Sequence, residues 1–197
     1  MRQEIKRAQI GVQRRHRAER GATLIEAVLF TVIALGLVTG GVVLYEQATK
    51  SARTNETVRM LTSLQSQVRA LFQSQASFGT ADLASVLIAA NAMPSAFQKD
   101  SNSDGDNDAL VSPFGSDVTV TGATSSFTVE IEDVPVDICA RVVAFDASGN
   151  GLAGTGIISV SDGTATDSDG MTSAQAATFC TTNDSGGEVA LTWTFGK

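Results

Sequence analysis

Glu26 is a carboxylate in surroundings that do not favour a charge. It is the one charged side chain between Ala22 and Tyr45, a segment whose other residues are mostly apolar. An unpaired carboxylate in lipid hydrocarbon costs on the order of 3 kcal/mol. We therefore expect Glu26 either to reach the polar headgroups of a membrane or to meet a cation.

The segment that carries Glu26 is long enough to cross a bilayer, because a helix from Ala22 to Tyr45 would measure roughly 36 Å. The 21 residues before it carry seven basic and two acidic side chains, whereas the rest of the chain carries seven basic and nineteen acidic ones. A short basic head beside an apolar run is typical of the cytoplasmic side of a membrane protein. The acidic remainder disfavours nucleic acid as a direct partner.

Gly21 is a candidate cleavage point. An ordinary secretory signal is cut after its apolar core, but here the glycine precedes that core. A cut after Gly21 would leave the apolar helix on the product and create a new amine on Ala22. This cation can pair with Glu26 of its own chain or of a neighbouring chain, and pairing with a neighbour would select the axial register of an assembly.

The spacing of apolar residues predicts a long helix. Beyond Tyr45 the sequence contains no Gly or Pro as far as Gln75, and apolar residues recur at intervals of three and four. We expect one nearly continuous helix from about Ala22 to about Gln75, apolar all round in its first half and amphipathic in its second half. The amphipathic stripe should lie on a folded domain.

The rest of the chain predicts a short helix followed by strands. The helix should fall within residues 80–93, with Thr80 or Asp82 near its cap and Pro94 beyond its end. The stretches that alternate or are rich in strand-forming residues are 117–122, 126–132, 156–161 and 188–195. Residues 135–145 and 172–180 are ambiguous, and helix is favoured for the second. The expected fold class is α+β, with the long helix packed on an antiparallel sheet.

The stretch "DSNSDGDND" follows part of a calcium-loop pattern. Oxygen-bearing side chains occupy positions one, three, five and nine, but position twelve is Val111, where the pattern needs a glutamate. Calcium would require a further ligand, such as Asp117. A calcium site and a solvated acidic loop both remain open, and no other cofactor is indicated. The candidate ligands are Asp100, Asn102, Asp104 and Asp108.

The sequence offers little for catalysis. Its only histidine is His16, in the basic head, so residues 22–197 contain neither a Ser–His nor a Cys–His pair. Glu130 and Glu132 share one face of a predicted strand, where a solvated face is the better interpretation. We therefore do not expect an enzyme.

The stretch "RGATLIEAVLFTVIALGLV" resembles the leader junction and N-terminal helix of type IV pilins. In that family a prepilin peptidase cuts after the glycine, here Gly21, and methylates the new amine, here on Ala22. The glutamate fifth after the cut, here Glu26, is the family's assembly residue, and Thr23 belongs to the same motif. The resemblance thus implies an enzyme that creates the cation for Glu26.

Three further stretches, "SPFGSDVTV", "VPVDICARVV" and "AATFC", resemble the type IVb branch of this family. They correspond to a turn before a strand, a proline-led segment with a cysteine, and a second cysteine near the C terminus. The resemblance implies a disulfide between Cys139 and Cys180, and a compartment outside the cytoplasm favours the same bond. Closing a loop of this size is worth roughly 4 kcal/mol by chain entropy.

For the whole chain the resemblance implies a major subunit of a type IVb-like pilus that serves adhesion, aggregation or conjugation. Residues 1–21 would be a cleaved cytoplasmic leader, residues 22–50 the transmembrane and assembly half of the long helix, and residues 51–197 a periplasmic or extracellular globular domain. The expected partners are identical subunits, the prepilin peptidase and the assembly machinery of the inner membrane. The chain would cross the inner membrane once before assembly and lie in an extracellular pilus afterwards.

Two alternatives remain open from the sequence. A minor pilin or a type II secretion pseudopilin would share the Gly21 junction and differ in abundance. A monomeric membrane-tethered binding domain would keep its leader and would not need Glu26.

Overall fold

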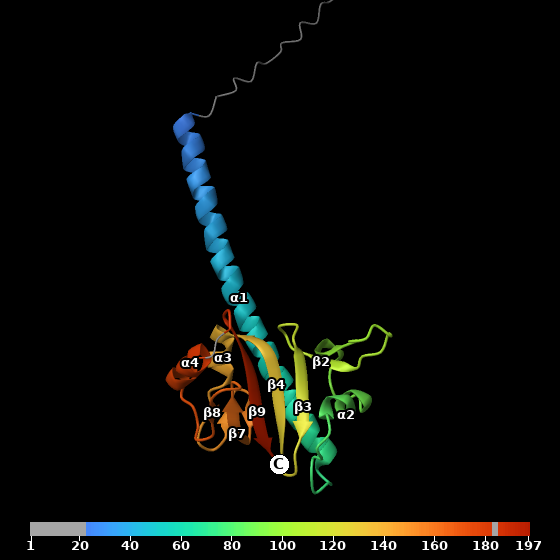
Figure 1. The fold of residues 1–197 in the computed structure, drawn as a ribbon. Coiled ribbons are helices and arrows are strands. Elements are labelled where there is room, and N and C mark those ends of the chain that lie inside the picture. Colours follow the sequence, from blue (N-terminus) through green and yellow to red (C-terminus); the bar gives the residue numbers. More distant parts are fainter. Residues whose placement is uncertain (1–22, 183–184) are drawn as a thin grey trace, which may run out of the picture. The chain divides into compact units, whose positions relative to one another are not determined.

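The computed structural model describes residues 23–182 and 185–197 (Figure 1). The chain divides into two compact units, residues 1–44 and residues 45–197. The elements, in chain order, are α1 (Leu24–Phe72), α2 (Leu83–Ala89), the 3-10 helix η1 (Ser95–Phe97), β1 (Gln98–Lys99), β2 (Ala109–Val111), β3 (Asp117–Gly122), β4 (Ser126–Pro135), α3 (Val136–Val142), β5 (Asn150–Gly151), β6 (Gly154–Thr155), β7 (Ile157–Ser161), β8 (Thr166–Asp167), α4 (Ser173–Thr182) and β9 (Glu188–Gly196).

Helix α1 is long and apolar enough to cross a membrane, judged by length and composition. The large apolar side chains of its first half are exposed, as the 84% exposure of Leu24 and the 74% exposure of Phe30 illustrate. Its threonine hydroxyls bond within the helix: Thr31 donates to the Val28 carbonyl at 2.8 Å and Thr39 to the Leu35 carbonyl at 3.0 Å. The polar atoms of these side chains thus have partners without water, as a lipid environment requires.

A seven-stranded antiparallel sheet forms the centre of the second unit, with the strand order β1-β2-β3-β4-β9-β7-β8. The last strand of the chain, β9, lies between β4 and β7. Its residues alternate in burial because successive side chains of a strand point to opposite faces. The buried side chains are Val189, Leu191, Trp193 and Phe195. Figure 1 shows the second half of α1 behind this sheet.

The core joins the amphipathic half of α1 to one face of the sheet. Met60, Leu61, Leu64, Val68 and Phe72 recur at the spacing of one helix face, and each is at most 9% exposed. Burying a side chain of this kind contributes about 1.5–3 kcal/mol. Aromatic contacts continue the core into the sheet, with ring centroids 5.7 Å apart between Phe72 and Phe78 and 5.3 Å apart in the next two pairs, Phe78–Phe127 and Phe127–Phe195.

The predicted α+β fold class is confirmed, and the differences are shifted element ends and short strands that the sequence did not indicate. The long helix ends at Phe72 and not at Gln75, and the short helix occupies only residues 83–89 of the predicted 80–93. Asp82 caps the short helix, because its carboxylate accepts a hydrogen bond from the Ala84 amide at 2.9 Å. The ambiguous stretch 135–145 contains α3, which begins after Pro135, and the second one contains α4 as favoured. The short strands β1, β2, β5, β6 and β8 were not predicted.

A polar clamp fixes α1 to the sheet and the β5–β6 hairpin. Gln65, only 5% exposed, donates its amide to the Thr155 carbonyl and accepts from the Thr155 amide at 3.2 Å. One turn later Arg69 donates to the Thr155 carbonyl at 3.1 Å and to the Gly196 carbonyl at 2.8 Å. Gly156, with φ +71°, lies where any Cβ would collide with the Arg69 guanidinium. Two side chains of α1 thus satisfy backbone groups that lie far away in sequence.

The clamp predicts a specific loss of stability in Gln65→Leu. The substitution replaces the amide group by an apolar side chain of similar size. The Thr155 amide then loses its acceptor, and its carbonyl keeps only the bond from Arg69, so the free energy of unfolding should fall by about 1–3 kcal/mol. Chemical denaturation of the purified chain in detergent measures this loss. Gln67→Leu is the matched control, because the half-buried Gln67 amide makes no hydrogen bond among the described residues. Equal stability of the two variants would contradict the clamp.

Candidate functional site

Thr23 directly precedes α1, and Glu26 lies in the first turn of this helix. The Glu26 amide donates to the Thr23 carbonyl at 2.9 Å and approaches its hydroxyl at 3.4 Å, and the Ala27 amide donates to the same carbonyl at 3.1 Å. Thr23 therefore caps the helix. Glu26 occupies the third helical position, where the positive end of the helix dipole stabilises a carboxylate. The sequence pattern Thr-x-x-Glu signals this cap, but we did not predict it from the sequence.

Gly21 and Ala22 lie outside the described residues. Cleavage after Gly21, methylation of the Ala22 amine and its pairing with Glu26 consequently stay predictions. The described part of the helix nevertheless places the Glu26 side chain in the exposed first turn of an apolar rod.

Exposed apolar side chains run along the first half of α1. A continuous apolar surface of this length is unusual for a soluble monomer and indicates contact with lipid or with protein. The side chains concerned are Leu24, Ile25, Val28, Leu29, Phe30, Val32, Ile33, Leu35, Leu37, Val38, Val42, Val43, Leu44 and Tyr45.

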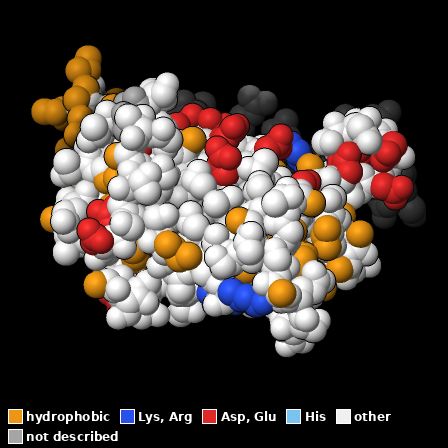
Figure 2. All heavy atoms as spheres, turned by 60° about the horizontal axis from the view of Figure 1, so that its bottom comes forward, with side chains coloured by type: hydrophobic (Ala, Val, Ile, Leu, Met, Phe, Trp, Pro, Cys, Tyr) orange, Lys and Arg blue, Asp and Glu red, His pale blue; other side chains and the backbone are white. Residues whose placement is uncertain are grey.

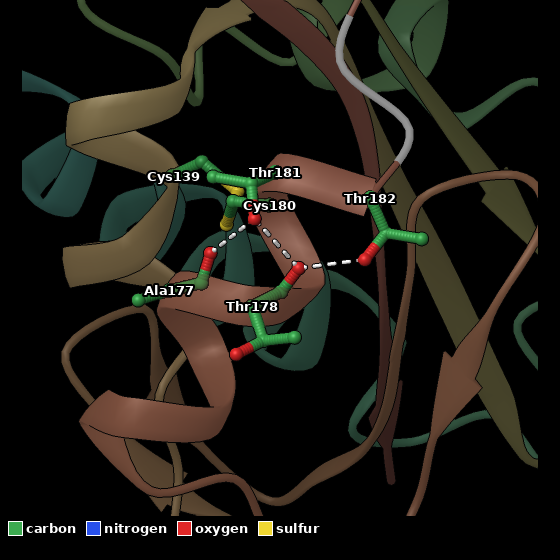
Figure 3. The surroundings of a disulfide bond; sticks show 6 residues. All are labelled: Cys139, Ala177, Thr178, Cys180, Thr181 and Thr182. Atoms are coloured by element: carbon green, nitrogen blue, oxygen red, sulfur yellow. Dashed lines mark hydrogen bonds between the residues drawn. A yellow bond between two sulfur atoms is a disulfide. The ribbon is translucent and has the colours of Figure 1, made fainter.

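A disulfide joins Cys139 on α3 to Cys180 on α4 (Figure 3), with 6.0 Å between their Cα atoms. Both cysteines are fully buried. This is the pairing that the resemblance implies. Beside it, the Thr181 hydroxyl donates to the Ala177 carbonyl at 3.1 Å, so α4 satisfies its own polar side chains on the exposed side of the bond. The bond fixes two short helices to each other, neither of which is long enough to be stable alone.

Comparison with known proteins identifies the family. The family model described as PilS N terminal matches residues 51–195, well over half of the chain. The chain belongs to the PilS family of type IV pilins. A crystal structure of a type IV b pilin from Salmonella typhi is similar in fold, with a TM-score of 0.55 and 18% sequence identity. That similarity covers 71% of this chain and 97% of the Salmonella chain. No curated protein matches the sequence significantly.

The pilin fold accounts for several observations together. A long apolar helix, an antiparallel sheet and a disulfide near the C terminus are the parts that a pilin subunit combines. Pilins are structural subunits and not enzymes, which agrees with the expectation from the sequence.

The acidic loop of this pilin is organised by its own carboxylates. Asp100 accepts hydrogen bonds from the amides of Ser103 at 2.6 Å and Gly105 at 2.8 Å, and Asp108 accepts from the Ser101 amide at 2.7 Å. The amide of Asp104 bonds to Asn102 at 3.0 Å. No group of three His, Cys, Asp or Glu side chains suited to a metal ion occurs in the described part of the chain, so calcium is not supported.

Backbone amides hold the pKa of Asp100 below its usual range, chiefly that of Gly105 and then those of Ser103, Asp104 and Asn102. Because the pKa is lower in the folded loop than in the unfolded chain, this carboxylate stabilises the loop above about pH 4, the value of a free aspartate. The stabilisation is lost as the pH falls through the lower folded pKa.

We predict that the Gly105 amide resonance moves toward its unfolded position only below about pH 4, as Asp100 takes up a proton. An NMR titration of the chain in detergent measures this change. Asp100→Asn should disorder residues 100–105 at neutral pH. Asp106→Asn should not, because the Asp106 carboxylate accepts no hydrogen bond from the described residues. The same loss of order in both variants would argue against the assignment to Asp100.

Proposed function

We propose that this pilin is a major subunit of a type IVb-like pilus, held in the inner membrane by α1, cut after Gly21 and polymerised into a helical filament. The observation that carries the proposal is the exposed apolar half of α1 with Glu26 in its first turn. Residues 1–21 are then the cytoplasmic leader, residues 22–50 the transmembrane and assembly half of the helix, and residues 51–197 the periplasmic or extracellular domain.

Insertion in the membrane is supported by the surface of the helix. Its first half presents apolar side chains on all sides, and the hydroxyls of Thr31 and Thr39 bond to helix carbonyls. The seven basic side chains among residues 1–21 favour a cytoplasmic location for the N terminus. The domain with the disulfide then lies on the oxidising side of the membrane.

When the pilin leaves the lipid and enters a filament, the apolar surface of α1 must be buried again. Neighbouring copies bury it when their helices pack together, and a contact between two different surfaces of one chain adds copies without closing. Glu26 becomes the costly group in this apolar environment unless a cation reaches it. The amine of Ala22, created by the prepilin peptidase, is the cation we assign to it.

The filament implies three partners: identical subunits, the prepilin peptidase and the assembly machinery of the inner membrane. Before assembly the pilin is a single-pass protein of the inner membrane, and after assembly it is extracellular. Adhesion, aggregation or conjugation are the activities that such a pilus serves.

The proposed processing predicts the N terminus of the mature chain. The mature chain should begin at Ala22 and should weigh about 2.5 kDa less than the full chain, at roughly 110–120 Da per removed residue. Intact-mass measurement and N-terminal peptide mapping of protein from sheared filaments test it. Methylation of the Ala22 amine would add about 14 Da, the mass of one methylene. A mature chain that still carries Arg20 would refute the processing.

The proposed role of Glu26 in assembly predicts the behaviour of Glu26→Gln. Glutamine also serves at the third position of a capping box, so the substitution keeps the helix start and removes only the charge. If the charge selects the docking subunit, the variant should be cut normally and should accumulate in the membrane fraction while sheared filaments disappear. Glu46→Gln is the matched control, an exposed carboxylate on the same helix, and should assemble. Wild-type filament yield from Glu26→Gln would exclude the assembly role.

A further inference from the structure

The two ends of the β4–β9 pair carry opposite charges. At one end a hollow of about 380 Å³ is lined by Glu132, Asp133, Glu188 and the neighbouring backbone. A bulge in β4 between Ile131 and Val134 places Glu132 and Asp133 at this hollow, and Glu188 begins β9 there. All three carboxylates are exposed. We call this surface the acidic end.

Within the described residues, the carboxylates of the acidic end take part in no ion pair. The ion pairs among the described residues are Lys50–Asp137 and Lys99–Asp117, and neither includes Glu132, Asp133 or Glu188. Three negative charges around one hollow repel one another, so a cation placed among them would be favoured.

The opposite end of β9 carries Arg69 and Lys197. Arg69 donates to the Gly196 carbonyl at 2.8 Å, and the Lys197 ammonium donates to the Gln75 carbonyl. Carbonyl oxygens satisfy these donors but do not neutralise their charge. The two side chains border a groove of about 180 Å³ whose apolar lining includes Phe72 and Phe78. We call this surface the basic end.

The two ends cannot meet within one copy. Strand β9 has nine residues between them, which at about 3.4 Å each separates the ends by roughly 30 Å. Helix α1 spans the same interval, since Lys50 pairs with Asp137 near the acidic end and Arg69 bonds to Gly196 at the basic end. In Figure 2, with the C-terminal end of the domain turned toward the viewer, the largest blue patch lies apart from the red patches.

We infer that the basic end of one copy docks on the acidic end of a second copy, with Lys197 directed into the hollow formed by Glu132 and Glu188. This contact rests on the proposed filament and specifies one of its interfaces. The occupant is a second copy because the chain itself supplies both complementary charges. The contact joins two different surfaces, so it leaves one of each free at the ends of a stack and admits further copies.

Exposed charge pairs between the basic and the acidic end orient the two copies more than they add to the affinity between them. Exposed pairs contribute little to affinity and are screened by salt. The contact therefore selects the axial partner, while the apolar helices supply most of the burial.

A charge exchange tests the contact. Lys197→Glu alone, and the double variant Glu132→Lys with Glu188→Lys, should each lower the yield of sheared filaments by about tenfold. The chain that carries all three substitutions has both charges exchanged and should recover most of the wild-type yield. Glu130→Lys is the matched control, because this exposed carboxylate lies on β4 but does not line the hollow, and its yield should stay at the wild-type level.

Each result bears on the contact. Wild-type yields from both single-end variants, or loss of filaments from both without recovery in the combined chain, would overturn it.

Non-reducing electrophoresis of the membrane fraction shows whether each variant folds with its disulfide. If Lys197→Glu does not fold, Lys197→Gln keeps a donor for the Gln75 carbonyl, and its filaments should dissociate at lower salt than wild-type filaments. Unchanged dissociation in Lys197→Gln also overturns the contact. Failure of the wild type to form filaments would instead count against the proposed function.

Discussion

The constraint on which the structure depends is that one continuous helix must serve two environments. The second half of α1 buries an apolar stripe from Met60 to Phe72 against the sheet, and this burial anchors the domain. The first half has no comparable polar face, and its apolar side chains stay exposed in the single chain. Because both halves belong to the same helix, any membrane or protein that binds the first half also holds the domain that is packed on the second half. In the proposed function, the membrane and then the neighbouring subunits of the filament cover this same surface.

The division of labour within α1 also explains where its polar residues stand. Gln65 and Arg69 donate hydrogen bonds to backbone carbonyls of the β5–β6 hairpin and of β9. These bonds restrict the rotation of the helix about its own axis more than apolar contacts do. Apolar side chains tolerate small rotations, whereas a buried amide that must both donate and accept does not. The domain therefore presents its charged ends in a fixed direction relative to the part of α1 that lies within it.

The sequence predicted the parts of the fold that rest on local periodicity. The apolar spacing of three and four in α1 and the alternation in β3, β4 and β9 are properties of neighbouring residues, and these elements appear where expected. The hairpin of β5 and β6 has two residues per strand and is held by Gln65, which lies 90 residues from Thr155 in sequence, so no local pattern reveals it. At the start of α1, the pattern Thr23-x-x-Glu26 also predicts a helix cap. We used these two residues only as part of the pilin motif and therefore did not predict the cap.

The position of β9 has a consequence for the order in which the domain is completed. A ribosome delivers residues 188–196 after β4 and β7, yet this strand fills the gap between them. Until it arrives, both neighbours have an unpaired edge, and unpaired edges are sites of mispairing between nascent chains. Phe127 and Val160 then lack the Phe195 and Trp193 that stand opposite them in the finished sheet. Loss of residues 188–196 would therefore remove the centre of the sheet and not its margin.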